Sequence, residues 1–108
     1  MKEEKTITSL DQTIEYMLSA DYKDRFKAEF WQLSIRASKL EHYIKRIKDA
    51  QAAGEPEPPH DCSVELLEEQ LDCMYDYCRI LLKRGLVEHI NLYDVEQRVE
   101  GPKSYFDE

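Results

Sequence analysis

Apolar residues recur at alternating steps of four and three in the stretch from residue 22 to residue 53. This spacing is typical of a heptad repeat, which places apolar side chains on one face of a helix. The repeated residues are Phe26, Phe30, Leu33, Ala37, Leu40, Ile44 and Ile47. No glycine or proline interrupts the stretch, and Asp21 can cap its start. The sequence therefore predicts one long helix over about residues 22–53.

A second segment shows the same spacing after a turn that stops a helix. The turn contains Gly54, Pro56, Pro58 and Pro59. The apolar repeat that follows consists of Leu67, Leu71, Met74, Cys78 and Leu81. Asp61 or Ser63 can cap this second long helix, which is predicted over about residues 63–90. Gly85 is expected to end or weaken it, unless the apolar residues that follow carry the helix for another turn.

A short helix is predicted before the first long one, over about residues 10–20. Ser9 and Gln12 have the spacing of a capping box, and the apolar residues of this segment fall on one face: Leu10, Ile14, Met17 and Leu18. Two long helices joined by a short turn pack antiparallel. The expected fold class is all-α, an antiparallel helical hairpin with a short N-terminal helix, in a single domain over residues 1–92. Residues 93–108 are interpreted as an acidic C-terminal tail, with Tyr105 and Phe106 as candidate anchors.

Each long helix carries a second apolar stripe beside its heptad repeat. On the first helix this stripe consists of Trp31, Ile35 and Ser38. On the second helix it consists of Leu66, Cys73, Tyr77 and Ile80. A two-helix hairpin buries only one stripe per helix, and a lone hairpin is marginally stable. The second stripes therefore need the N-terminal helix, another protomer or both, and we expect a homo-oligomer.

Composition excludes several classes of function. The formal net charge of −8 disfavours binding to DNA or RNA, because phosphates require a positive surface. No apolar run approaches the roughly 20 residues of a membrane span, and no signal peptide is evident. The odd number of cysteines, three, argues against a disulfide framework and favours a reducing cytoplasm. We therefore expect a cytoplasmic protein that does not bind nucleic acid polymers.

The distribution of charge suggests one candidate site. The first long helix is rich in basic residues, whereas the turn and the start of the second long helix hold only acids, so that Lys45–Lys48 and Glu65–Glu69 can form edge ion pairs. Farther along, the second helix turns basic at Arg79, Lys83 and Arg84. Antiparallel pairing places these cations beside Phe30, Trp31 and Arg36, an arrangement that suits a planar anion. In the alternative interpretation, Phe30 and Trp31 are core residues and the cations complement a helix dipole.

Motifs for catalysis and for metal binding are missing. The sequence has no glycine-rich phosphate loop and no nucleophile elbow. His60 and Cys62 resemble a fragment of a metal site, but zinc sites usually have closely paired ligands on both sides, and buried, inert thiols are the better interpretation of the cysteines. We expect no catalytic residues, no metal and no cofactor.

Four stretches carry a resemblance to a known group of proteins: DYKDRFKAEFWQLSIR (21–36), KLEHYI (39–44), LLEEQLDCMYDY (66–77) and ILLKR (80–84). Together they resemble the helical hairpin domain shared by phage anti-CBASS and anti-Thoeris sponges, over about residues 22–92. The resemblance rests on the apolar spacing and on Gln70, Met74, Tyr77 and Arg84. It implies a homo-oligomer, often a hexamer, that sequesters nucleotide second messengers of bacterial immunity between protomers, in the cytoplasm of the bacterial host.

The chain departs from the pattern of this group at several positions. A tyrosine is common where Phe30 stands, an alanine at Gly85, a glycine at His89 and a proline at Ser63. The small β-rich N-terminal domain of the anti-Thoeris members is absent. The resemblance therefore favours a cyclic di- or trinucleotide over a ligand of the cyclic ADP-ribose type.

The expected ligand-binding residues follow from the basic end and from the resemblance. Arg84 would bind phosphate together with Arg36 or Lys83, and Lys45 would come from a neighbouring protomer. Phe30 and Trp31 are the candidate surfaces for base stacking. Two other functions stay open: an acidic interaction protein that inhibits a host defence protein or nuclease, and a structural oligomer without a ligand. The acidic run over residues 55–76 motivates the first of these.

Overall fold

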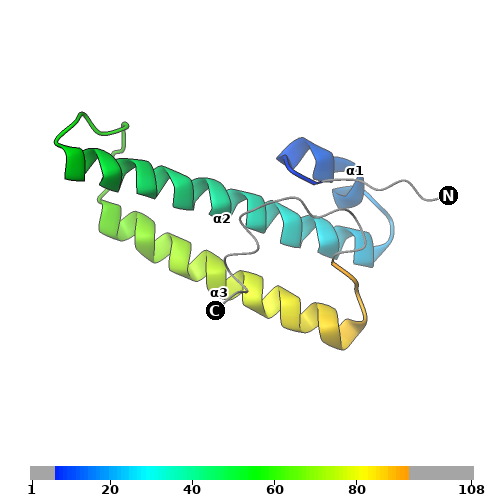
Figure 1. The fold of residues 1–108 in the computed structure, drawn as a ribbon. Helices are drawn as coiled ribbons and strands as arrows, with labels where there is room; N and C mark the ends of the chain where they lie inside the picture. The colour runs from blue at the N-terminus through cyan, green and yellow to red at the C-terminus, as the bar shows by residue number, and fades with distance from the viewer. Residues whose placement is uncertain (1–6, 93–108) are drawn as a thin grey trace.

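The computed structural model describes residues 7–92, and over these residues it contains helices and no strand. A short 3-10 helix, η1 (Leu10–Thr13), leads into α1 (Ile14–Met17), and the long helices α2 (Tyr22–Ala53) and α3 (Val64–Glu88) follow. Figure 1 shows α2 and α3 running antiparallel as a hairpin, with the N-terminal segment against the first half of α2. The predicted all-α class is confirmed.

Helix α2 begins and ends where the sequence predicts. The Asp21 carboxylate accepts a hydrogen bond from the Lys23 backbone N–H at 2.9 Å and caps its start. Gly54, with a φ of 69°, ends it in the left-handed conformation that glycine adopts at no steric cost. At the start of α3, the Ser63 hydroxyl accepts a hydrogen bond from the Leu66 N–H at 3.1 Å, so Ser63 is the cap.

Helix α3 ends close to the predicted boundary near residue 90. Of the two alternatives at Gly85, the second holds: the helix continues for almost another turn, to Glu88, and stops at His89 with a φ of 60°. The Ile90 N–H donates to the Gly85 carbonyl at 2.9 Å, as in a Schellman cap. A Cβ at position 85 would lie 3.2 Å from the Ile90 carbonyl oxygen. Gly85 therefore lets the chain return closely over α3 as residues 90–92.

Substituting His89 by glycine should raise the free energy of unfolding by about 0.5–1 kcal/mol. The change relieves roughly 1–2 kcal/mol of left-handed strain and costs roughly 0.5–1 kcal/mol in unfolded-state entropy. Denaturant unfolding measures the difference. The control is His42→Gly, at an exposed position inside α2, which should lower stability by about 1 kcal/mol. Loss of stability in both variants would contradict a strained cap at His89.

The predicted heptad residues form the contact between α2 and α3. On α2, six of the seven heptad residues are buried, and the seventh, Leu40, is partly buried. On α3, three heptad residues are buried: Leu71, Cys78 and Leu81. The other two, Leu67 and Met74, are partly buried and pack against the core. An ion pair joins Lys48 and Glu68 near the turn, as the charge pattern suggests. The heptad repeats therefore explain why α2 and α3 pack against each other.

The second stripe of α2 is covered within the same chain. Tyr16 of α1 packs edge-on against Trp31, with ring centroids 5.0 Å apart, and the Trp31 indole N–H donates to the Leu92 carbonyl at 3.3 Å. Ile35 is buried as well. The N-terminal helix is shorter than predicted, and its expected apolar face is wrong: Ile14, Met17 and Leu18 are exposed, whereas Ile7 and Thr13 are buried.

The three cysteines lie in different environments. Cys78 is buried, and burial raises the pKa of its thiol to about 11, which makes it inert. Cys62 is partly exposed and Cys73 is exposed, so the expectation of buried thiols is wrong for Cys73. Within residues 7–92, no three His, Cys, Asp or Glu side chains cluster as metal ligands, and no helix is long and apolar enough to cross a membrane. The acidic tail expected over residues 93–108, with Tyr105 and Phe106, lies outside the described residues.

Candidate ligand-binding site

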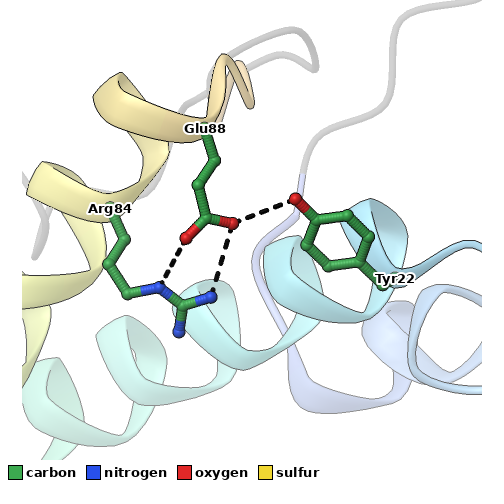
Figure 2. A network of polar contacts seen from close by, with 3 residues as sticks. All are labelled: Tyr22, Arg84 and Glu88. Carbon is green, nitrogen blue, oxygen red and sulfur yellow. Dashed lines mark hydrogen bonds and ion pairs between the residues drawn. The ribbon is translucent and has the colours of Figure 1, made fainter.

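Arg84 is the centre of a polar network at the open end of the hairpin, where α3 ends beside the start of α2. Its Nε donates to one oxygen of the Glu88 carboxylate at 2.9 Å, and a terminal nitrogen donates to the other oxygen at 3.4 Å. The Tyr22 hydroxyl of α2 donates to the same carboxylate at 3.0 Å. Figure 2 shows these three side chains converging from the two helices. Arg84 thus already binds one anion through two nitrogens.

Aromatic rings surround this network. The Arg84 guanidinium lies over the Phe26 ring, 4.7 Å from its centroid, and this contact holds the planar group in place. Next to it, the Tyr77 hydroxyl of α3 donates to the Glu29 carboxylate of α2. Tyr22 and Tyr77 are both exposed, so each presents a ring to solvent beside Arg84.

The groups of this network shift one another's pKa values. The hydrogen bond from Arg84, together with that from Tyr22, lowers the pKa of Glu88, and Glu88 raises the pKa of Arg84. The carboxylates of Glu88 and Glu29 raise the pKa values of the Tyr22 and Tyr77 hydroxyls, respectively. Each group is therefore held in its ordinary charge state at neutral pH. A charged guanidinium in this position can bind an anion reversibly.

The structure assigns the two candidate stacking residues to the core. Phe30 is 0% exposed and Trp31 is 2% exposed. Within this chain neither ring offers an exposed surface for base stacking, and the alternative interpretation as core residues fits. The reason is that α1 and residue 92 cover the stripe on which Trp31 lies. The exposed rings near Arg84 are instead those of Tyr22 and Tyr77.

The four predicted cations do not converge within the chain. Lys83 is exposed next to Arg84, whereas Arg36 lies ten residues beyond Phe26, about 15 Å along α2. Lys45 lies about 28 Å along α2 from Phe26 and pairs with Asp49 at 3.0 Å. Antiparallel pairing places Arg84 beside Tyr22 and Phe26, closer to the start of α2 than the sequence analysis expected.

Sequence reasoning missed four members of the network: Tyr22, Phe26, Glu29 and Glu88. One signal was available, because Arg84 and Glu88 are four residues apart on one helix, a spacing that favours an ion pair. The contacts between Tyr22 and Glu88 and between Glu29 and Tyr77 depend on the register of the two helices, which the heptad repeat does not determine. A separate pocket near the end of α3, lined mainly by Leu82, Leu86 and Ile90, is apolar and unsuited to phosphate.

Comparison with known families places most of the hairpin in one group. The family model described as Sequestin matches residues 20–85, more than half of the chain. The matched range includes both long helices almost completely, and it includes Tyr22, Tyr77 and Arg84. No curated protein and no solved structure matches the chain.

Proposed function

We propose that this chain, which belongs to the Sequestin family, is a phage-type anti-defence sponge that binds cyclic di- or trinucleotide immune messengers in the bacterial cytoplasm and does not cleave them. Membership of the family confirms the resemblance to phage sponge proteins, and the family name denotes sequestration of a molecule rather than catalysis. The cyclic nucleotide, the cytoplasmic location and the homo-oligomer, with a hexamer favoured by resemblance, are our proposals.

The observation that carries the choice of ligand is the double contact between Arg84 and a carboxylate, beside two exposed phenol rings. A phosphate can replace that carboxylate with the same fork geometry. The rings of Tyr22 and Tyr77 offer faces on which bases stack. Arg36 or Lys83 would supply a second cation, and Lys45 would reach the site only from a neighbouring protomer, because of its distance along α2.

A sponge acts by mass action. It lowers the free concentration of a messenger when its sites outnumber the messenger and its Kd lies below the signalling concentration. Isothermal titration of the intact protein with a panel of cyclic di- and trinucleotides tests the proposal. We expect saturable binding of at least one of them, and chromatography should recover that nucleotide unchanged. The absence of heat with every member of the panel would refute the proposal.

Glu88 should oppose ligand binding, because its carboxylate holds the position on Arg84 that a phosphate would take. Glu88→Gln should therefore bind the nucleotide more tightly, by up to about fivefold, the range of an exposed ion pair. The control is Glu65→Gln, which removes the same charge from an exposed position at the other end of α3. Titration of both variants measures the effect, and equal or weaker binding in Glu88→Gln would contradict competition.

The acidic face favours one alternative function. The side chains of Glu55, Glu57, Asp61, Glu65, Glu69, Asp72 and Asp76 are all exposed along the turn and the first half of α3. Such a surface can imitate the charge of DNA and bind a basic host protein. Capture from a host lysate discriminates between the two functions, because an inhibitor retains a protein whereas a sponge retains a nucleotide.

A further inference from the structure

An apolar pocket of about 630 Å³ lies beside the last turns of α3. Its walls are mainly the side chains of Leu82, Leu86, Ile90 and Leu92. The Leu86 side chain is 79% exposed, more than any other large apolar side chain among the described residues. A volume of roughly 300–1,000 Å³ is typical of pockets that hold organic groups. The pocket therefore has the size and the apolar walls to hold apolar side chains.

The geometry of the helix separates this pocket from the candidate ligand site. At about 100° per residue, Tyr77 lies about 180° and Arg84 about 160° around α3 from Leu86. The pocket forms where residues 90–92 cross back over Gly85, on the side of α3 away from the Arg84 network. An occupant of the pocket would therefore not contact the proposed nucleotide-binding residues.

The segment that follows the pocket in the sequence contains a suitable occupant. Residues 93–108 hold a single pair of adjacent apolar side chains, Tyr105 and Phe106. Gly101 and Pro102 precede this pair and are a signal for a turn. Aromatic side chains bury large apolar areas, so such a pair gains more from entering a pocket than the isolated valines of the segment.

The occupant is within reach of the pocket. Leu92, which immediately precedes the segment, packs over Gly85 and is itself a wall of the pocket. Thirteen residues separate Leu92 from Tyr105, and a flexible chain of that length spans about 20 Å on average. Leu82 and Leu86 each lie within about one helical turn of Gly85. A tether of this length gives an effective concentration in the millimolar range, so a weak apolar contact is enough to fill the pocket.

The charge of the segment also fits this end of α3. Residues 93–108 contain five acids and two bases, and the acids Asp107 and Glu108 follow the aromatic pair directly. Arg79 is exposed three residues before the start of the pocket, on the same side of α3. An ion pair at such a surface adds little energy, but it favours an acidic segment over a basic one.

We propose that Tyr105 and Phe106 fold back into the pocket between α3 and residues 90–92 of the same chain, with Leu86 as the central contact. The contact lies within one chain, so it does not depend on protein concentration. It uses no nucleotide and no residue of the Arg84 network. It therefore stands or falls independently of the proposed function.

The first experiment detects the contact directly by NMR in the full chain. Phenylalanine rings are protonated and leucine methyl groups are labelled in an otherwise deuterated protein. We expect nuclear Overhauser effects between the Phe106 ring and the Leu86 methyl groups. The chain has two other phenylalanines, Phe26 and Phe30, so loss of the signal in Phe106→Leu identifies the ring. A mixture of chains labelled separately on phenylalanine and on leucine should give no such signal.

The second experiment measures protection of the segment from trypsin, which cleaves after Arg98 and Lys103. Leu86→Ser should speed this cleavage at least about threefold, because cleavage follows the population in which the segment is undocked. The control is Val87→Ser, at a neighbouring side chain that is 76% exposed and does not line the pocket. It should keep the wild-type rate. Circular dichroism checks that both variants keep the fold.

Three results would overturn the proposal. The first is the absence of a signal between Phe106 and Leu86 in the wild-type chain. The second is the same signal in the mixture of separately labelled chains, which would show that the segment docks on another copy. The third is an equal rate of cleavage in Leu86→Ser and Val87→Ser. All three are read without nucleotide, so the failure of the sponge proposal would not produce them.

Discussion

Replacing Phe30 by alanine should lower the free energy of unfolding by about 3–5 kcal/mol, because the ring is completely buried between the helices and its removal leaves a cavity. In a domain of this size the melting temperature should fall by roughly 12 °C or more. Urea unfolding monitored by circular dichroism measures the change. This is the largest effect we expect from a single substitution on stability.

Two comparisons separate a core role for Phe30 from a ligand-binding role. Leu18→Ala removes an exposed apolar side chain and should change stability by less than about 0.5 kcal/mol. Phe30→Leu keeps most of the buried volume and should leave nucleotide affinity unchanged. Weaker nucleotide binding by a stable Phe30→Leu protein would contradict the core assignment, as would a Phe30→Ala variant within about 1 kcal/mol of the wild type.

Replacing Arg84 by methionine should weaken nucleotide binding at least about tenfold, since the phosphate loses a charged, two-pronged donor. This is the largest effect on nucleotide binding that we expect from a single substitution, because both the ion pair and the ring contact of the candidate site involve Arg84. The fold should persist, since the Arg84 side chain is half exposed and its ion pair with Glu88 lies at the surface. Titration calorimetry together with a thermal melt measures both properties.

A matched control for this variant is Arg46→Met. Arg46 is also an arginine over an aromatic ring, 5.7 Å from the centroid of Tyr43, but it lies in the half of α2 that leads to the turn. Its substitution should leave nucleotide affinity unchanged. Equal losses of nucleotide affinity in Arg84→Met and Arg46→Met would indicate a general effect of positive charge. An unchanged nucleotide affinity in Arg84→Met would show that the ligand binds elsewhere.

The long helices could be predicted because their signals are local. An uninterrupted heptad repeat, the Asp21 cap and Gly54 determine both ends of α2. The end of α3 was predicted to within about two residues, but the sequence left the effect of Gly85 open. Glycine is common at helix ends, but Gly85 lies inside α3, where the missing Cβ makes room for residues 90–92. The true cap, His89, adopts the left-handed conformation far less readily than glycine does, so it is a weaker signal of a helix end than Gly54.

The candidate site was predicted only in part. The basic half-turn of α3, with Arg84, follows from the sequence. Whether Phe30 and Trp31 face solvent depends on what covers α2, and the covering residues, Tyr16 and Leu92, are 15 and 61 residues away from Trp31. The spacing of apolar residues within α2 contains no information about these contacts with distant parts of the chain. The resemblance identified the family. By contrast, Phe26 could be identified as the ring that supports the Arg84 guanidinium only once the register of the two helices was known.

The position of the Arg84 network at the open end of the hairpin has a consequence for the order of folding. The Lys48–Glu68 contact next to the turn closes a loop of 20 residues, whereas the Tyr22–Glu88 contact closes one of 66 residues. The longer closure costs about 1 kcal/mol more in chain entropy. We therefore expect the hairpin to form from the turn outward, with its open end the last part to form and the first to open. A ligand bound there would close the end of the hairpin that opens most readily, and so slow the unfolding of the whole chain.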